Sequence, residues 1–345
     1  MSTIGSGIMN PKTERVGRPR LLVLATGGTI AGRADSAIAG RYASGEVGID
    51  ALLAFTADLG IEADLVAEPV AAVGSQDMDA AIWDRLHGRI AEVFANDQAD
   101  GVIVTHGTDT AEETAFLLDL VLPPGRPVVL VGAMRPANVL GADGPRNLAN
   151  AIRVAGDPAS YGRGVLVVLG DAVFGARDVR KALTSGTDAF RAVPGGPLAT
   201  VSPASLRYFA PPVAASWRGR YRLPPLGAWP PVAVLYAHAN MDMAVTHAIL
   251  STKPAGVVLA GVGHGNASAA VLKALAGAAG QGVSVVRSTH LNEGTVTRNL
   301  EVDDDASHFI AGGSLNPQKC RILLQLLIAD GVDDIAGQQR IFDGF

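Results

Sequence analysis

The sequence predicts an α/β protein with a larger N-terminal domain built on a mostly parallel sheet and a smaller C-terminal α/β domain. Three observations lead to this prediction. Short apolar runs alternate with helical patterns, a proline-rich stretch interrupts that alternation, and 345 residues are too many for one typical compact domain. Hydrophobic residues make up 48% of the chain and charged residues 18%, a balance that fills a large core and argues against disorder.

The N-terminal domain is expected over residues 21–208, after a tail at residues 1–20. Its expected strands are residues 21–25, 101–105, 127–132 and 164–169, and the helical segments between them include residues 110–122 and 147–155. The strand candidates are nearly continuous apolar runs, which are typical of a sheet covered on both faces. Strands that alternate with helices in this way predict a mostly parallel sheet.

Residues 209–231 are rich in proline and are expected to form a linker. The alternation resumes after them and defines the C-terminal domain, at residues 232–345. Its expected strands are residues 232–236, 256–262 and 283–288, and its expected helices lie near residues 268–279 and 317–329. Pro317 suits the first turn of the last helix, where a missing N–H costs nothing.

The charge and the cysteine content limit which partners and which cellular compartment we expect. The net charge is −5 and the one basic run, residues 12–20, lies at the terminus, so we expect no nucleic-acid partner. The single cysteine, Cys320, allows no intrachain disulfide and suits a reducing compartment. Residues 1–19 contain no apolar run like that of a signal peptide, and no apolar stretch is long enough to cross a membrane. We therefore expect a cytoplasmic protein, or a periplasmic one if an export signal was removed.

Three polar clusters follow expected strands, at residues 26–32, 106–110 and 263–266. Ligands of open α/β sheets bind beyond the carboxyl ends of the strands. These clusters are therefore the first places to look for a site.

The first cluster is rich in glycine but fits neither common phosphate-binding pattern. Gly32 is followed by Arg33 where a P-loop needs lysine, and the dinucleotide pattern G-x-G-x-x-G is absent. A purely structural turn remains an alternative. The functional interpretation is that the glycines let the backbone approach a ligand, to which Thr29 presents a hydroxyl.

The second cluster has a structural interpretation as well as a catalytic one. Thr108 or Asp109 could cap the following helix, with Glu112 and Glu113 in its first turn. A hydroxyl beside a carboxylate beyond a strand end also suits catalysis. We expect His106 to have a structural role.

The chain resembles the asparaginase/glutaminase family, and within it the bacterial type II L-asparaginases. The matching stretches run in the family's order from about residue 21 to the C-terminus. They are ATGGTIAG (25–32), GSQDM (74–78), VTHGTDT (104–110) with EET (112–114), VGAMRP (131–136), ADGP (142–145), GVGHGN (261–266), VRS (286–288), EVDD (301–304) and LNPQK (315–319).

The resemblance implies hydrolysis of the side-chain amide of L-asparagine to L-aspartate and ammonia, through a threonine nucleophile and an acyl-enzyme. It also implies a homotetramer, a dimer of close dimers in which a neighbouring subunit completes each site. Neither a cofactor nor a metal is expected, since no His-x-x-x-His pair carries a glutamate and one cysteine cannot build a zinc site.

The resemblance assigns the catalytic roles residue by residue. Thr29 matches the nucleophile, and Tyr42 falls at the spacing of the flexible-loop tyrosine. Thr108, Asp109 and Lys181 match a second hydroxyl–carboxylate–lysine triad, in which Thr108 and Asp109 also contact substrate. Lys181 either takes the Thr108 proton as a base or polarises that hydroxyl as a cation.

The resemblance also assigns the groups that hold the substrate. Ser75, Gln76 and Asp109 match groups that hold the α-carboxylate and α-amine, and Gly74 is a further substrate-binding residue. Asn266 and Glu301 match groups from the adjacent subunit. The stretches at residues 75–77 and 301–303 look like those of asparagine-preferring members. We therefore expect asparagine to be preferred over glutamine, although one methylene supplies only about 1–3 kcal/mol of discrimination.

One segment is expected to move, and two positions depart from the family pattern. Residues 32–48, which include Tyr42, are expected to form a lid that excludes water, with an ordinary surface loop as the alternative. His264 stands where the family often has asparagine, and Arg180 replaces a common threonine before Lys181.

Three other functions compete with L-asparaginase at this stage. They are a glutaminase-asparaginase, a non-catalytic amino-acid-binding or sensor protein on the same fold, and a subunit of a tRNA-dependent amidotransferase. Turnover of the two amides and the need for a partner protein would separate them.

Overall fold

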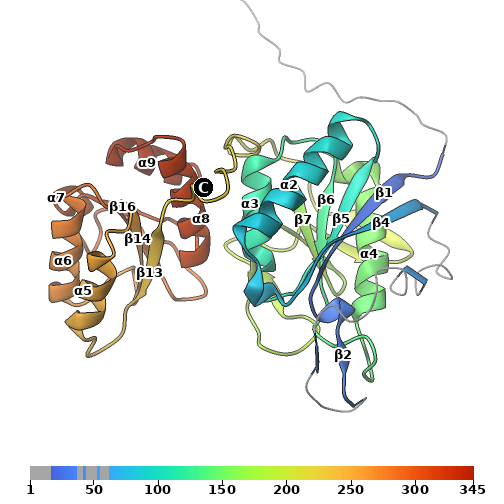
Figure 1. The fold of residues 1–345 in the computed structure, drawn as a ribbon, viewed down its shortest axis with the longest axis horizontal. Coiled ribbons are helices and arrows are strands. Elements are labelled where there is room, and N and C mark those ends of the chain that lie inside the picture. Colours follow the sequence, from blue (N-terminus) through green and yellow to red (C-terminus); the bar gives the residue numbers. More distant parts are fainter. Residues whose placement is uncertain (1–16, 37–41, 44–52, 55–61) are drawn as a thin grey trace, which may run out of the picture.

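The computed structural model describes residues 17–36, 42–43, 53–54 and 62–345. Within these ranges the chain forms a larger N-terminal domain and a smaller C-terminal domain that lie side by side (Figure 1). The fold class predicted from the sequence is confirmed. Most of the predicted tail lies outside the described residues.

The N-terminal domain contains an eight-stranded sheet within the described ranges. In spatial order its strands are β12 (Ser205–Tyr208), β11 (Ala199–Ser202), β8 (Ala172–Gly175), β7 (Val165–Leu169), β6 (Val128–Val131), β5 (Gly101–Thr105), β1 (Arg20–Gly27) and β4 (Asp64–Val73). Neighbouring strands from β4 to β7 are parallel, and the pairings from β7 to β12 are antiparallel. The sheet is therefore mostly parallel.

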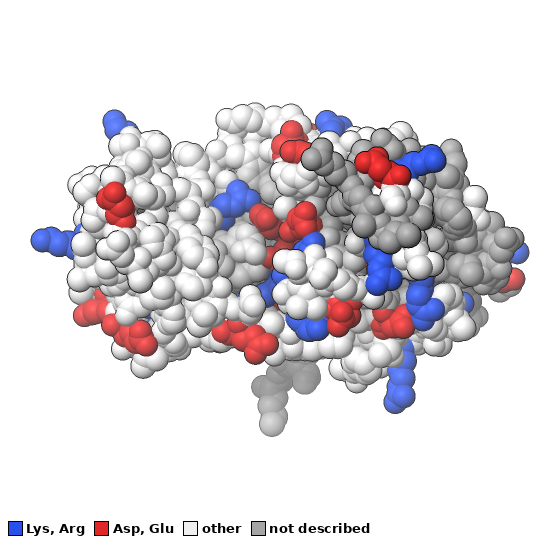
Figure 2. Space-filling view, turned by 90° about the horizontal axis from the view of Figure 1, so that it is seen from below, with Lys and Arg blue, Asp and Glu red and all other residues white. Residues whose placement is uncertain are grey.

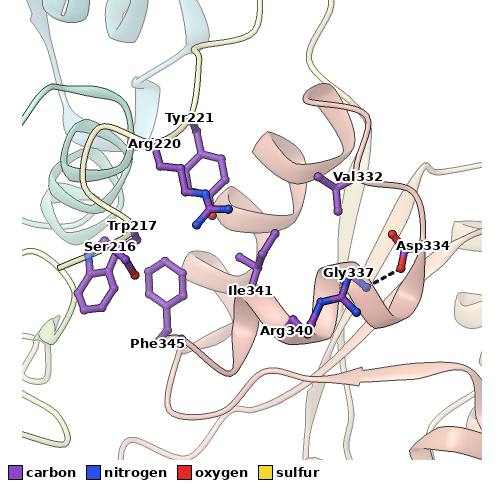
Figure 3. Close-up of a pocket in the computed structure, with 11 residues that line it drawn as sticks. Ser216, Trp217, Arg220, Tyr221, Val332, Asp334, Gly337, Arg340, Ile341 and Phe345 are labelled. Carbon is purple, nitrogen blue, oxygen red and sulfur yellow. Dashed lines mark hydrogen bonds between the residues drawn. The ribbon is translucent and has the colours of Figure 1, made fainter. Parts of the chain in front are cut away.

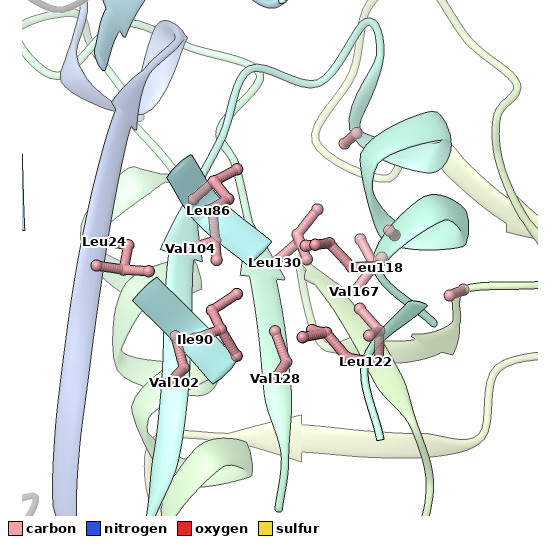
Figure 4. Packing of buried hydrophobic residues seen from close by; sticks show 14 of the residues in the cluster. Leu24, Leu86, Ile90, Val102, Val104, Leu118, Leu122, Val128, Leu130 and Val167 are labelled. Atoms are coloured by element: carbon pink, nitrogen blue, oxygen red, sulfur yellow. The ribbon is translucent and has the colours of Figure 1, made fainter. Parts of the chain in front are cut away.

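Helices cover both faces of this sheet (Figure 1). Helices α2 (Ala80–Ala95) and α3 (Ala111–Val121) pack on one face, and α4 (Gly144–Gly156) packs on the other. Alternate residues of one strand belong to the two cores. Val102 and Val104 face α2 and α3 (Figure 4), while Ile103 belongs to the core that includes residues of α4. Both faces are apolar for this reason, which explains the uninterrupted apolar runs.

The C-terminal domain contains a four-stranded parallel sheet. Its strands, in spatial order, are β13 (Val232–Tyr236), β14 (Gly256–Gly261), β15 (Ser284–Thr289) and β16 (Phe309–Ala311). The helices are α5 (Met243–Ser251), α6 (Ala269–Ala279), α7 (Asp304–Ser307), α8 (Pro317–Ala329) and α9 (Ile335–Phe342). Helix α8 also contacts α3, so it joins the two domains.

Residues 209–231, the predicted linker, contain no regular element but pack closely. Tyr221 is only 6% exposed, and the Trp217 ring lies 4.9 Å from that of Phe345. Together with α9 this segment lines a pocket of about 320 Å³ (Figure 3), whose lining contains none of the predicted site residues that the structure describes.

Candidate active site

The loop after β1 lies against the loop after β5. Gly27 and Gly28 have φ angles of 105° and 78°, which side chains rarely tolerate. A Cβ atom on Gly28 would lie 2.4 Å from the backbone nitrogen of Gly107. Glycine is therefore required for this approach, which brings the 3-10 helix η1 (Thr29–Ala31) and its buried Thr29 beside the residues that precede Thr108.

A third loop joins these two. The short 3-10 helix η2 (Ser75–Asp77) follows β4, and a Cβ atom on Gly107 would lie 2.7 Å from Ser75 Oγ. The Asp109 backbone N–H donates to Ser75 Oγ at 3.2 Å, and the Thr110 hydroxyl donates to the Ser75 carbonyl at 2.7 Å. Ser75 is thereby held against the loop that carries Asp109.

Neither Thr108 nor Asp109 is the N-cap of α3, so the capping role that the sequence offered as a structural alternative is wrong. The N-cap is Thr110, and its side chain makes no capping hydrogen bond. Its hydroxyl holds Ser75 instead, while Thr108 and Asp109 are used in a separate contact described next.

Lys181 meets both Thr108 and Asp109. It ends the short strand β9 (Val179–Lys181), which pairs only with β10 (Phe190–Ala192) among the described strands. Lys181 Nζ donates to Thr108 Oγ1 at 2.8 Å and to Asp109 Oδ1 at 2.5 Å. Thr108 is buried, whereas the Asp109 side chain is 61% exposed. A hydroxyl, a cation and an accessible carboxylate therefore meet at the carboxyl end of β5.

Other predicted residues are placed less completely. The Gln76 side chain is exposed and lies against Gly74, where a Cβ atom would meet the Gln76 amide. Tyr42 lies in β3 (Tyr42–Ala43), which pairs with β2 (Arg33–Ala34), but its side chain falls outside the described residues. Most of the predicted lid, residues 32–48, falls outside them as well.

Asn266 and Glu301 form a separate group on the C-terminal domain. The Asn266 amide donates to Glu301 Oε2 at 3.2 Å. Behind them the fully buried Arg287 forms an ion pair with Asp304 at 2.6 Å and donates to the His264 carbonyl at 3.0 Å. His264 Nε2 accepts from the Thr297 backbone N–H at 2.8 Å, so this ring braces the loop that precedes Asn266.

Glu112 is a residue whose importance the sequence did not reveal. It is only 4% exposed, yet its carboxylate accepts from the Lys181 backbone N–H at 3.0 Å and from the Asn316 amide at 2.9 Å. Two signals in the sequence bear on it: Glu112 stands three residues after Asp109, and it opens the matched stretch at residues 112–114. An acid in the first turn of a helix, which the macrodipole favours, explains the same residue without a function.

His106 lies wholly inside the N-terminal domain. Its Nδ1 lies 2.7 Å from the Gly107 carbonyl, so Nδ1 carries the proton, and Nε2 lies 2.9 Å from Thr114 Oγ1. Trp83 Nε1 donates to the same hydroxyl. Every polar atom of a neutral imidazole is satisfied in this arrangement, which is consistent with a structural role.

His106 is expected to make the protein sensitive to acid. Burial lowers the pKa of His106 from 6.5 to about 4, so the unfolded chain binds a proton more readily than the folded one. The stabilisation is complete above about pH 6.5 and is lost as the pH falls toward 4, by up to about 3 kcal/mol. Urea unfolding at pH 7 and pH 4.5 should show this loss.

The control is the variant His106→Gln, measured at the same two pH values. It is needed because burial also lowers the pKa of His87, which contributes to the acid sensitivity of the wild type. The variant should lose clearly less stability between the two pH values than the wild type. Equal losses of stability in the wild type and the variant would show that His106 is not the source of the acid sensitivity.

Among the described residues no group of three His, Cys, Asp or Glu side chains could hold a metal. No helix among the described residues is long and apolar enough to span a membrane. On the face seen from below, where β1 leads into η1, basic and acidic side chains are interspersed (Figure 2).

Comparison with known proteins identifies relatives over nearly the whole chain. Residues 20–214 match the family model described as "Asparaginase, N-terminal", and residues 231–342 match "Glutaminase/Asparaginase C-terminal domain". "L-asparaginase 2" of Escherichia coli is 42% identical over 93% of this chain and 92% of its own length. "Probable L-asparaginase periplasmic" of Haemophilus influenzae is 41% identical over 94% and 93%. "Glutaminase-asparaginase" of Pseudomonas fluorescens is 36% identical over 93% and 89%.

Proposed function

Because the chain belongs to the asparaginase/glutaminase family, we propose that it hydrolyses L-asparagine to L-aspartate and ammonia, with weaker action on L-glutamine. The observation that carries the proposal is the contact of Lys181 Nζ with Thr108 and Asp109, beside the glycine loop that holds Thr29. A buried hydroxyl, a cation and an accessible carboxylate suit a small zwitterionic amide.

In the proposed mechanism Thr29 is the nucleophile. Its hydroxyl oxygen attacks the side-chain carbonyl carbon, the hydroxyl proton passes to the amide nitrogen, and the C–N bond breaks to release ammonia. Water then attacks the ester, the C–O bond breaks, and aspartate leaves with Thr29 restored. Backbone N–H groups of the glycine loop would stabilise the negative oxygen of each tetrahedral intermediate.

The triad has a separate proposed role. Lys181 Nζ lies within hydrogen-bond distance of both the Thr108 hydroxyl and the Asp109 carboxylate. We assign Lys181 the role of a cation that polarises Thr108, because an ammonium group is the natural partner of the Asp109 carboxylate. Asp109 would pair with the ammonium of the substrate, and Ser75 would donate to its carboxylate.

The decisive assay is ammonia release by the purified protein from L-asparagine and, separately, from L-glutamine. We expect release from both, with kcat/KM higher for asparagine by about 10- to 200-fold, the range that one methylene supplies. A higher value for glutamine would instead make the chain a glutaminase-asparaginase. Tight binding of asparagine without release would indicate a sensor, and release only with a partner protein would indicate an amidotransferase subunit.

The assembly is a proposal of the same kind. We infer a homotetramer, a dimer of close dimers, in which Asn266 and Glu301 of one subunit complete the site of its neighbour. The separate position of this pair on the C-terminal domain supports the arrangement. Sedimentation should find a tetramer, and an active monomer would contradict the shared site.

The proposed compartment is the cytoplasm, and it rests on the single, buried cysteine. One relative is named as periplasmic. Fractionation of cells that carry the complete gene, followed by activity measurements on each fraction, would place the protein.

A further inference from the structure

Lys181 lies on a two-stranded ribbon that is too small to fix its position without support from other residues. Strand β9 has three residues, and within the described chain it pairs only with the three-residue strand β10. A two-stranded ribbon of this size is marginal in water. The position of Lys181 Nζ relative to Thr108 therefore depends on whatever packs against β9.

The C-terminal domain supplies that support through the start of α8. Lys319 is 1% exposed, and its Nζ donates to the backbone carbonyls of Arg177 at 2.8 Å and Val179 at 2.5 Å. A buried ammonium is costly unless it is paired or fully hydrogen-bonded. Here the Lys319 ammonium donates to two backbone carbonyls, and the second of these, that of Val179, belongs to β9.

A second connection runs through Glu112. Its Oε2 accepts from the Lys181 backbone N–H, while Oε1 accepts from the side chains of Asn316 and Gln318. Asn316 is also the N-cap of α8 and accepts from the Lys319 backbone N–H. The beginning of α8 is thus tied both to β9 and to α3, which follows directly on Thr108 and Asp109.

Arginines complete the attachment. Arg180 donates to the backbone carbonyls of Asn292 and Ser314, and Arg177 donates to Ser314 Oγ at 2.8 Å. Val179 and Arg180 of β9 are therefore bonded directly to the C-terminal domain of the same chain, and Lys181 is connected to it through Glu112. The departure at Arg180 noted in the sequence belongs to this attachment.

We propose that Lys319 and Glu112 are positioning residues for Lys181, through which the C-terminal domain aligns the triad of its own chain. This role differs from that of Asn266 and Glu301, which are proposed to serve the neighbouring subunit. The inference rests on the proposed function, because it assigns to Lys181 a part in ammonia release. A misplacement of about 1 Å in a catalytic group can lower a rate about 100-fold.

The test uses the full-length protein with Lys319→Met, which keeps the length of the side chain and removes its donors. We expect kcat for asparagine to fall on the order of 10- to 100-fold while KM changes less than about threefold, since Lys319 does not touch the substrate. The matched control is Cys320→Ala, the next residue of α8, which is equally buried and bonds only within the C-terminal domain. It should lose stability but keep kcat.

A double-mutant cycle separates positioning from general damage. In a Lys181→Met background, adding Lys319→Met should change the residual kcat less than about twofold, because the residue to be aligned is gone. If Lys319→Met does not fold, Glu112→Gln carries the same comparison. Unchanged kcat in a folded variant, or a full multiplicative loss in the cycle, would overturn the inference. Absence of ammonia release by the wild type would overturn the proposed function instead.

Discussion

Thr29→Ala is expected to lower ammonia release from asparagine by about 10⁴-fold or more, because no other group can replace a covalent nucleophile. Thr29 is buried in η1, beside a loop whose glycines leave no room for side chains. The substitution removes a few atoms at the surface of the site, so the free energy of unfolding should change by only about 1 kcal/mol. Steady-state kinetics and urea unfolding measure the two effects separately.

Thr29→Ser is the matched control, since it keeps the hydroxyl and removes only the methyl group. It should retain far more activity than Thr29→Ala. An alanine variant with normal turnover would refute the assignment of Thr29 as the nucleophile. An unfolded alanine variant would show that the loss of activity is structural. Equal losses in both variants would point to packing of the methyl group, not to chemistry.

The central strands could be predicted from the sequence because they are buried on both faces. Strand β5 has the predicted bounds, and β7 differs by one residue. Strand β4 was missed, and the reason is physical. It lies at the edge of the sheet, where its burial alternates irregularly and Pro69 is tolerated. Its sequence, which contains Pro69 and the two acids Asp64 and Glu68, does not resemble a buried strand.

The limits of the site prediction follow from distance along the chain. The resemblance placed Thr108, Asp109 and Lys181 together, and in the structure their side chains meet. It could not show that Glu112 bonds to Asn316, since 204 residues separate them and both look like ordinary residues of a helix start. Such contacts depend on how the two domains pack against each other, and no local sequence pattern predicts this packing.

Glu301→Ala is expected to raise the KM for asparagine on the order of 100-fold, because a lost charged contact in a closed site costs about 2–5 kcal/mol. The Glu301 carboxylate bonds to Asn266 on the C-terminal domain, whereas Lys181 bonds to Thr108 and Asp109. At asparagine concentrations far below both KM values, activity should be on the order of 100-fold lower than that of the wild type.

Mixing this variant with Thr29→Ala tests whether the two residues serve one site across a subunit boundary. Each variant alone is inactive at low asparagine concentration. After unfolding and refolding together in equal amounts, mixed close dimers contain one site with both residues intact, so roughly a quarter of the wild-type activity should return. Separately refolded samples, combined afterwards, are the control and should stay inactive. If no activity returns although mixed close dimers form, Glu301 acts on the Thr29 of its own chain, and the proposal of a shared site is wrong.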